Sequence, residues 1–356
     1  MLMKTLGTSL LLCLIISFLT LGQTNLEKSK KLFDEGKPDD AKALFEQVIK
    51  ESPGNAEAYY YLGVLAIDSD YDEAIDYLEK ATQLDNLSAK YRLMLGNAYG
   101  TKAARAGIFK KFGAASDCLK NFERAVQLDP KYIEARSSLI EYYLQAPGIM
   151  GGNVKKARAQ ADTIGMFDPY EGYMEEARIH QYENEPQETE QSYLKAISVD
   201  SKKLPAYQAL WSFYLTEKNE DKAAKLFSRA IHAVDKRSEL YLGAGVYYVE
   251  QKNFTSAREM LHAALKEDST NLPVYYQLGK AALFSGEDLQ NGLACLEMYV
   301  HGDPPKNAPS RAHAHWRMGM IYEKLGKQEE ARSEYHKSLE LNSRLEEAKK
   351  ALEALK

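Results

Sequence analysis

The stretch 241–269, YLGAGVYYVEQKNFTSAREMLHAALKEDS, constrains the possible folds of this chain more than any other feature. Its small and apolar residues follow two stripes with steps of three or four, the spacing of one helix face. The stripes contain Tyr241, Ala244, Gly245 and Tyr248, and then Ala257, Leu261 and Ala264. The polar segment 251–253 predicts a turn between two helices. Because Gly245 and Ala257 have almost no side chain, we expect the two helices to pack closely in a hairpin.

A single hairpin of roughly 34 residues buries too little surface to fold alone, so similar units are expected on either side. The same slots recur along the chain. The second unit has Tyr59, Leu62, Gly63, Ala74, Leu78 and Ala81, and the last has Met318, Gly319, Tyr322, Ala331 and Tyr335. Asp-Pro steps at Asp129-Pro130, Asp168-Pro169 and Asp303-Pro304 follow several second helices, where the fixed proline φ ends one helix.

These residues resemble the tetratricopeptide repeat, and the resemblance covers nearly all of 23–342. It implies an all-α, tetratricopeptide-like right-handed α-solenoid of about nine helix-turn-helix repeats with a C-terminal capping helix. The expected repeats span about 24–54, 55–87, 88–130, 131–169, 170–203, 204–237, 238–271, 272–305 and 306–342, and the capping helix lies in 343–356. The fold alone says little about function.

Residues 1–22 differ in composition from the rest of the chain. A single Lys is followed by an apolar run from Leu10 to Leu21, which predicts a secretory signal peptide with Gln23 as the first mature residue. We therefore expect an exported protein, periplasmic or extracellular. The alternative is an uncleaved leader that anchors the chain in a membrane.

Charge and cysteine usage narrow the class of partner. A formal net charge of -5 argues against a general nucleic-acid binder, which usually carries a basic excess. Cys118 and Cys295 fall in units far apart in the sequence, so both are predicted to be small core residues without a disulfide.

The resemblance implies that a ligand binds on a concave groove lined by the first helices. By spacing from the glycine slot, the groove residues are Tyr60, Leu93, Asn97, Glu141, Gln208, Leu242, Val246, Tyr276, Lys280, Trp316 and Met320. Aromatic side chains in a groove favour a protein or peptide partner. The alternative is that some of these side chains pack between neighbouring units. One form of the family grips a terminal carboxylate with Lys and Asn on adjacent first helices, but here Leu93 precedes Asn97 where Lys is required.

Two insertions interrupt the regular spacing at the same point of neighbouring hairpins, near 101–113 and 145–153, so we expect them to lie side by side. The first carries the edge candidates Lys102, Arg105, Phe109, Lys110, Lys111 and Phe112. These could attract an acidic partner or an anionic lipid surface; the alternative is a longer hairpin with solvated lysines. The glycines of the second, Gly148, Gly151 and Gly152, predict a turn with positive φ.

Other patterns give no recognisable catalytic or metal site. The acidic run that includes Asp68, Asp70 and Asp72 matches part of a calcium loop, but Glu73 occupies the glycine position. His313 and His315 lie two residues apart and would point to different helix faces. We therefore expect a non-enzymatic binding scaffold without cofactor or metal. The alternatives are a membrane-peripheral assembly or transport factor that uses the basic insertion, and an enzyme with a dispersed site.

Overall fold

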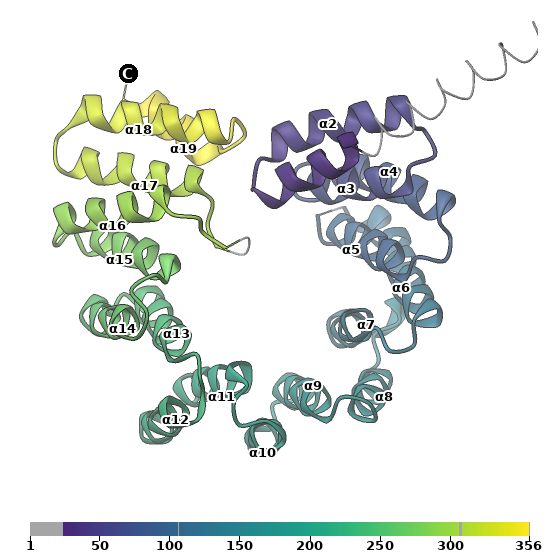
Figure 1. Ribbon diagram of the computed structural model, residues 1–356. Helices are drawn as coiled ribbons and strands as arrows, with labels where there is room; N and C mark the ends of the chain where they lie inside the picture. The colour runs from purple at the N-terminus through teal and green to yellow at the C-terminus, as the bar shows by residue number, and fades with distance from the viewer. Residues whose placement is uncertain (1–23, 106, 306–307, 356) are drawn as a thin grey trace, which may run out of the picture. The chain divides into compact units, whose positions relative to one another are not determined.

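The computed structural model describes residues 24–105, 107–305 and 308–355, and of 108–110 only the backbone. Within these ranges the chain consists of α-helices, turns and one short 3-10 helix, without a strand (Figure 1). The all-α prediction is therefore confirmed. The expected signal peptide at 1–22 lies outside the described residues.

The helices follow one another with short connections. A helix over 24–34 comes first. The others are α2 (Pro38–Glu51), α3 (Ala56–Ala66), α4 (Tyr71–Leu84), α5 (Ala89–Arg105), α6 (Ile108–Leu128), α7 (Ile133–Gln145), η1 (Gly148–Met150), α8 (Val154–Gly165), α9 (Pro169–Tyr182), α10 (Pro186–Val199), α11 (Leu204–Thr216), α12 (Glu220–Ala233), α13 (Arg237–Glu250), α14 (Phe254–Glu267), α15 (Leu272–Ser285), α16 (Leu289–His301), α17 (Arg311–Lys324), α18 (Gln328–Leu341) and α19 (Glu346–Ala354). Taken two at a time, the α-helices of the described chain form nine pairs followed by α19, as the repeat pattern predicts.

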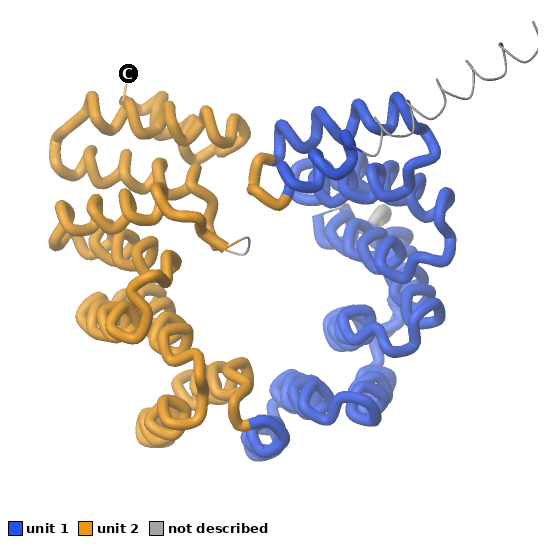
Figure 2. Tube along the Cα trace, viewed as in Figure 1, with its two compact units in different colours: residues 1–33, 38–200 blue, residues 34–37, 201–356 orange. Residues whose placement is uncertain are grey.

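The chain divides into two compact units (Figure 2). Among the described residues, unit 1 comprises 24–33 and 38–200, and unit 2 comprises 34–37 and 201–355. Within each unit the helices of a pair pack against each other, and consecutive first helices also touch: α7 meets α9 in unit 1, and α11, α13, α15 and α17 meet in turn in unit 2. The first helices of unit 2 therefore form a layer of their own, with α12, α14, α16 and α18 packed behind them (Figure 1).

The glycine slot explains why the two helices of a pair approach so closely. A Cβ atom added to Gly63 would lie 2.4 Å from Cγ of Leu78, so the leucine occupies the space that a side chain would need. The same contact recurs between Gly96 and Phe122, Gly245 and Leu261, Gly279 and Leu296, and Gly319 and Tyr335. Burying one such leucine against its neighbours contributes about 2 kcal/mol.

Polar side chains fix the starts of many helices. The caps that accept a backbone N–H from the first turn are Asn55, Asp70, Asn153, Asp168, Asn219, Asn253 and Ser310. Each such cap stabilises its helix by about 1 kcal/mol. The turns inside several pairs use a left-handed residue before the cap, such as Lys252 (φ 58°) and Gly326 (φ 73°).

The insertion at 101–113 lengthens two helices, as in the longer-hairpin alternative. α5 has 17 residues and α6 has 21, whereas α13 and α14 have 14 each. The alanines in this segment favour helix, and Ala103, Ala114 and Ala115 form a small buried cluster. Met150 of the second insertion packs on that cluster, so the two insertions lie together as predicted.

The glycines of the second insertion differ from one another. Gly151 has the predicted positive φ of 98°, but Gly148 and Gly152 do not. In the described part of the chain, no helix combines the length and the hydropathy that a membrane span needs.

Candidate protein-binding surface

The layer of first helices in unit 2 presents a row of partly exposed side chains, which we call the first-helix face of unit 2. It consists of Gln208 on α11, Leu242 and Val246 on α13, Lys280 on α15, and Trp316 and Met320 on α17. All six were predicted from their spacing to the glycine slot, and all six are half-buried. Trp316 also packs on the buried cluster that holds Leu345 next to α19. The face offers apolar and aromatic contacts that a partner can cover.

Three other predicted groove residues are core residues instead. The exposed fractions of Tyr60, Leu93 and Tyr276 are 6%, 7% and 3%. Tyr60 stacks on Tyr91 of the next first helix with ring centroids 5.0 Å apart, and Tyr276 accepts a 2.7 Å hydrogen bond from Nε of Arg317. These side chains pack between neighbouring first helices, so a ligand does not reach them without moving the core.

In unit 1 the charged groups on the equivalent surface between α7 and α9 pair with one another. Arg178 Nη2 lies 2.7 Å from Oε2 of Glu175, and its Nη1 lies 3.9 Å from Oε2 of the predicted residue Glu141. Ser137 donates a 2.5 Å hydrogen bond from its Oγ to Oε1 of Glu175 and accepts one of 2.8 Å from Arg178 at its carbonyl oxygen. The chain itself therefore supplies the partners of this arginine.

A cavity of about 480 Å³ opens in unit 1 between the two insertions. It contains the predicted residues Asn97, Glu141 and Lys111, and its other lining residues are Gly100, Thr101, Ala103, Ala104, Ala115, Cys118, Phe122, Ser138, Tyr142, Gln145, Ala146, Pro147 and Met150. The Tyr142 hydroxyl lies 2.6 Å from the carbonyl oxygen of Met150 and 3.0 Å from that of Ala115, which joins the two insertions. The sequence located both insertions, but it did not predict a cavity between them.

The basic insertion offers fewer accessible charges than its sequence suggests. Lys102 Nζ lies 2.7 Å from Oδ1 of Asp72, and the hydrogen bond to this carboxylate raises the Lys102 pKa. Arg105 donates a 3.0 Å hydrogen bond to the carbonyl oxygen of Asp68. Phe112 is exposed and Lys111 faces the cavity, whereas the side chains of Phe109 and Lys110 lie outside the described residues. Two of the predicted cations therefore bind the preceding helix pair.

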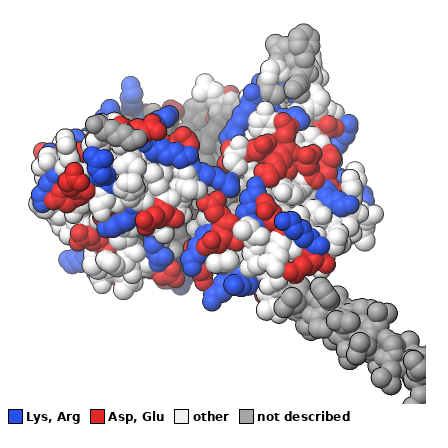
Figure 3. Space-filling model, turned by 90° about the horizontal axis from the view of Figure 1, so that it is seen from above, with Lys and Arg blue, Asp and Glu red and all other residues white. Residues whose placement is uncertain are grey.

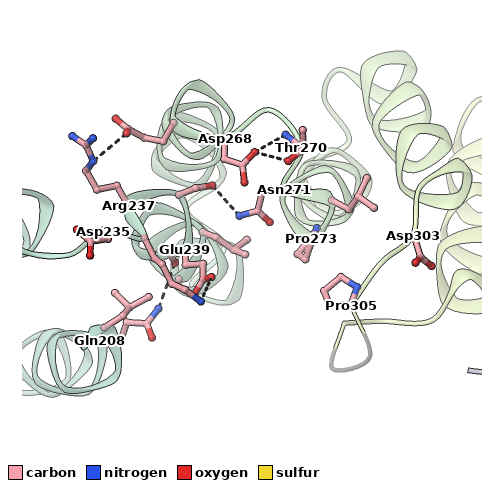
Figure 4. A pocket seen from close by; sticks show the side chains of 17 residues that line it. Gln208, Asp235, Arg237, Glu239, Asp268, Thr270, Asn271, Pro273, Asp303 and Pro305 are labelled. Atoms are coloured by element: carbon pink, nitrogen blue, oxygen red, sulfur yellow. Dashed lines mark hydrogen bonds and ion pairs between the residues drawn. The ribbon is translucent and has the colours of Figure 1, made fainter. Parts of the chain in front are cut away.

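A larger cavity, of about 880 Å³, lies in unit 2 where α13 and α15 begin (Figure 4). Gln208 and Leu242 of the first-helix face line it, together with Asn271. The Nδ2 of Asn271 donates a 2.8 Å hydrogen bond to Oγ of Ser238, and hydrogen bonds from Thr270 lower the pKa of Asp268. This cavity is rich in polar groups, and it extends the first-helix face toward the turns of unit 2.

Side chains of both charge signs lie on the face seen in Figure 3, where Asp and Glu also gather in one patch. The acidic run of the second repeat is used for structure: Asp70 caps α4, and Asp72 pairs with Lys102. His313 and His315 have different partners, Ser310 and Glu334. Across the described ranges, no three His, Cys, Asp or Glu side chains gather as a metal site would require.

The two thiols are buried and free, as predicted. Burial raises the pKa of Cys118 to about 12 and that of Cys295 to about 11. Both thiols are therefore protonated near neutral pH and poor nucleophiles.

The family models that match this sequence both describe the same repeat. Two models of the tetratricopeptide repeat match the sequence, one over 26–89 and 214–273 and the other over 312–345. No curated protein matches the sequence.

Several solved structures match the chain at low sequence identity. Yeast Tom70 is 13% identical with a TM-score of 0.46, and the match covers 94% of this chain and 88% of Tom70. A tetratricopeptide repeat protein from Parabacteroides merdae is 15% identical with a TM-score of 0.46, covering 73% of this chain and 98% of that one. A thermophilic repeat protein from Thermus thermophilus is 21% identical with a TM-score of 0.44, covering 55% and 99%.

Proposed function

The chain is a tetratricopeptide repeat protein, and we propose that it is a non-enzymatic scaffold that binds a protein or peptide segment on the first-helix face of unit 2. One observation carries this proposal. The six side chains of that face remain half-buried, while the opposite sides of the same helices fill the core with residues such as Leu210, Ala244 and Leu278. Half-buried apolar groups on rigid helices gain contact area from a partner without first becoming ordered.

A matched pair of methionines tests this surface. Met320 belongs to the first-helix face, whereas Met298 is 53% exposed on the second helix α16. Partners are first identified by cross-linking and mass spectrometry of the purified chain. Met320→Gln should then weaken binding by about tenfold, and Met298→Gln should leave it unchanged. Equal effects of the two variants, or an effect of Met298→Gln alone, would contradict the proposal.

We further propose that the protein acts after export, as a periplasmic or extracellular scaffold. The support is the leader at 1–22, with its single Lys and apolar run. Amino-terminal sequencing of the protein from its native cells should give Gln23 as the first residue. A chain that still begins at Met1 would contradict cleavage and favour the membrane-anchored alternative.

A further inference from the structure

Two cations lie next to each other on the first helices α15 and α17. Tyr276, Lys280 and Phe284 recur every four residues on α15 and so share one face of that helix. The Arg317 guanidinium of α17 lies over this face, with its central carbon 5.3 Å from the ring centroid of Tyr276 and 5.5 Å from that of Phe284. Lys280 sits between those two aromatic residues, and therefore beside the guanidinium.

In the described part of the chain, neither cation is neutralised by an ion pair. Within the described ranges, no Asp or Glu forms an ion pair with Lys280 or Arg317, and Nη1 of Arg317 is buried without a hydrogen-bond acceptor. Burial lowers the pKa of Lys280, and the neighbouring Arg317 lowers it further, although Glu250 acts in the opposite direction. Holding two like charges together in a partly dehydrated place is unfavourable until an anion joins them.

The groups around the two cations suggest what kind of anion this is. Phe284 is 49% exposed, and the Trp316 ring centroid lies 5.2 Å from the central carbon of the guanidinium. Met320 lies one turn beyond Trp316 on the same helix and is half-buried. A small inorganic ion would leave these apolar surfaces uncovered, whereas a peptide can place a carboxylate on the cations and a neighbouring side chain on the rings.

We propose that Lys280 and Arg317 anchor an acidic side chain, Glu or Asp, of a peptide segment bound to the first-helix face of unit 2. Nε of the guanidinium already donates to Tyr276 and Nη1 is buried, so Nη2 is the donor left for a carboxylate, and the lysine adds a point charge from the neighbouring helix. Phe284 and Trp316 then contact the residue next to the acidic one. This inference rests on the proposed scaffold function and specifies the chemistry of its partner.

The position of the tryptophans allows a direct test. The sequence contains two, Trp211 and Trp316. Trp211 is buried against Phe227 and Tyr247, so Trp211→Phe leaves Trp316 as the fluorescent reporter beside the site. The probe is an acetylated, amidated hexaglutamate peptide, whose carboxylates all belong to side chains. Hexaglutamine of the same length is the neutral control, and inorganic phosphate is the competing anion.

In the Trp211→Phe background, hexaglutamate should change the Trp316 emission saturably, and hexaglutamine should not. Lys280→Gln and Arg317→Gln should each weaken binding by about tenfold, and added salt should weaken the remainder. Lys225→Gln and Lys266→Gln remove the same charge from the exposed surface of the second helices α12 and α14 and should have no effect.

Several results would overturn the inference. The first is an equal response to both peptides, and the second is an unchanged affinity for hexaglutamate in the Lys280→Gln variant. The third is displacement of hexaglutamate by inorganic phosphate at a concentration below that of the peptide's glutamate side chains. Thermal unfolding of each variant identifies any loss that is due to misfolding, and Lys280→Gln, which removes a half-buried charge, should unfold no earlier than the parent. If a variant that combines Lys280→Gln with Arg317→Gln still binds an identified protein partner with full affinity, the acidic anchor is wrong while the scaffold function stands.

Discussion

The α7–α9 surface of unit 1 and the α15–α17 surface of unit 2 are both formed by first helices. Their arginines differ in whether a carboxylate of the chain pairs with them. Arg178 pairs with Glu175 at 2.7 Å and lies 3.9 Å from Glu141. Arg317 lies among aromatic rings beside Lys280 and has no carboxylate partner in the described chain. Arginines on the first helices of a repeat fold can therefore be paired with carboxylates of the chain or lie without such a pair, and the pattern of ion pairs separates the two cases.

Unit 1 also carries the two insertions, and we expect the largest loss of stability from a substitution at Gly152 in the second insertion. A Cβ atom on Gly152 would lie 1.7 Å from the carbonyl oxygen of Ala146, so Gly152→Ala forces the loop after α7 to move. We expect a loss of about 3 kcal/mol in the free energy of unfolding. The measurement is denaturant unfolding followed by the reactivity of Cys118, which reports on unit 1.

Gly148→Ala is the matched control, because a Cβ atom there would meet nothing within 4 Å. It should change the free energy of unfolding by less than about 0.5 kcal/mol. Tryptophan fluorescence comes only from unit 2, since Trp211 and Trp316 are the only two in the sequence, and it should be unaffected by either glycine variant. If both variants cost the same, the close contact at Gly152 does not determine the loop.

The second-largest effect is expected when Arg178 of unit 1 loses its nearest carboxylate, which makes its surroundings more like those of Arg317 in unit 2. Glu175→Gln removes the nearest carboxylate from Arg178 and leaves a partly buried cation without its main partner. The free energy of unfolding should fall by about 2 kcal/mol. Cys118 labelling under increasing urea measures the loss. A variant as stable as the parent would show that Glu141 or water compensates, and would remove the contrast with Arg317.

The opposite substitution gives Arg317 of unit 2 a carboxylate neighbour, as Arg178 has in unit 1. Lys280→Glu places a carboxylate beside Arg317 and removes the like-charge neighbour. We expect unit 2 to gain about 1 kcal/mol of stability, measured by tryptophan fluorescence during unfolding. The same variant should lose binding of the hexaglutamate probe. A destabilised Lys280→Glu chain would mean that the guanidinium needs no anion.

The smallest expected effect concerns a turn that both units share. Asn184 in unit 1 and Lys252 in unit 2 both have a left-handed φ, 59° and 58°, at the turn inside a helix pair. Lys252→Gly should raise stability by about 0.5–1 kcal/mol, because glycine adopts this conformation without strain. Asn184→Gly should gain less, since asparagine tolerates it better than lysine. Gly326→Ala, at the same point of the last pair, should lose about 1 kcal/mol.

The repeat architecture could be predicted from the sequence because it depends on local features. Gly245 and Leu261 indicate that two helices pack closely, and Asn253 indicates where the second helix begins. Which groove residues remain exposed depends on neighbouring helices, and a single repeat does not contain that information. Tyr276 occupies a predicted groove position, yet Arg317 on the next first helix covers it.

The candidate site was predicted only in part for the same reason. Lys280 and Trp316 were predicted, whereas Arg317 and Phe284 were missed. The four-residue recurrence of Tyr276, Lys280 and Phe284 was the available signal, but the sequence could not show that a guanidinium lies over it. The spacing also located the insertion at 101–113 without showing that Lys102 reaches Asp72 of the preceding pair.

The separate burial of Cys118 and Cys295 bears on redox state. Neither thiol forms a disulfide, and their raised pKa values keep both in the unreactive form. The folded repeats therefore depend on no oxidase to assemble and on no reductant to persist.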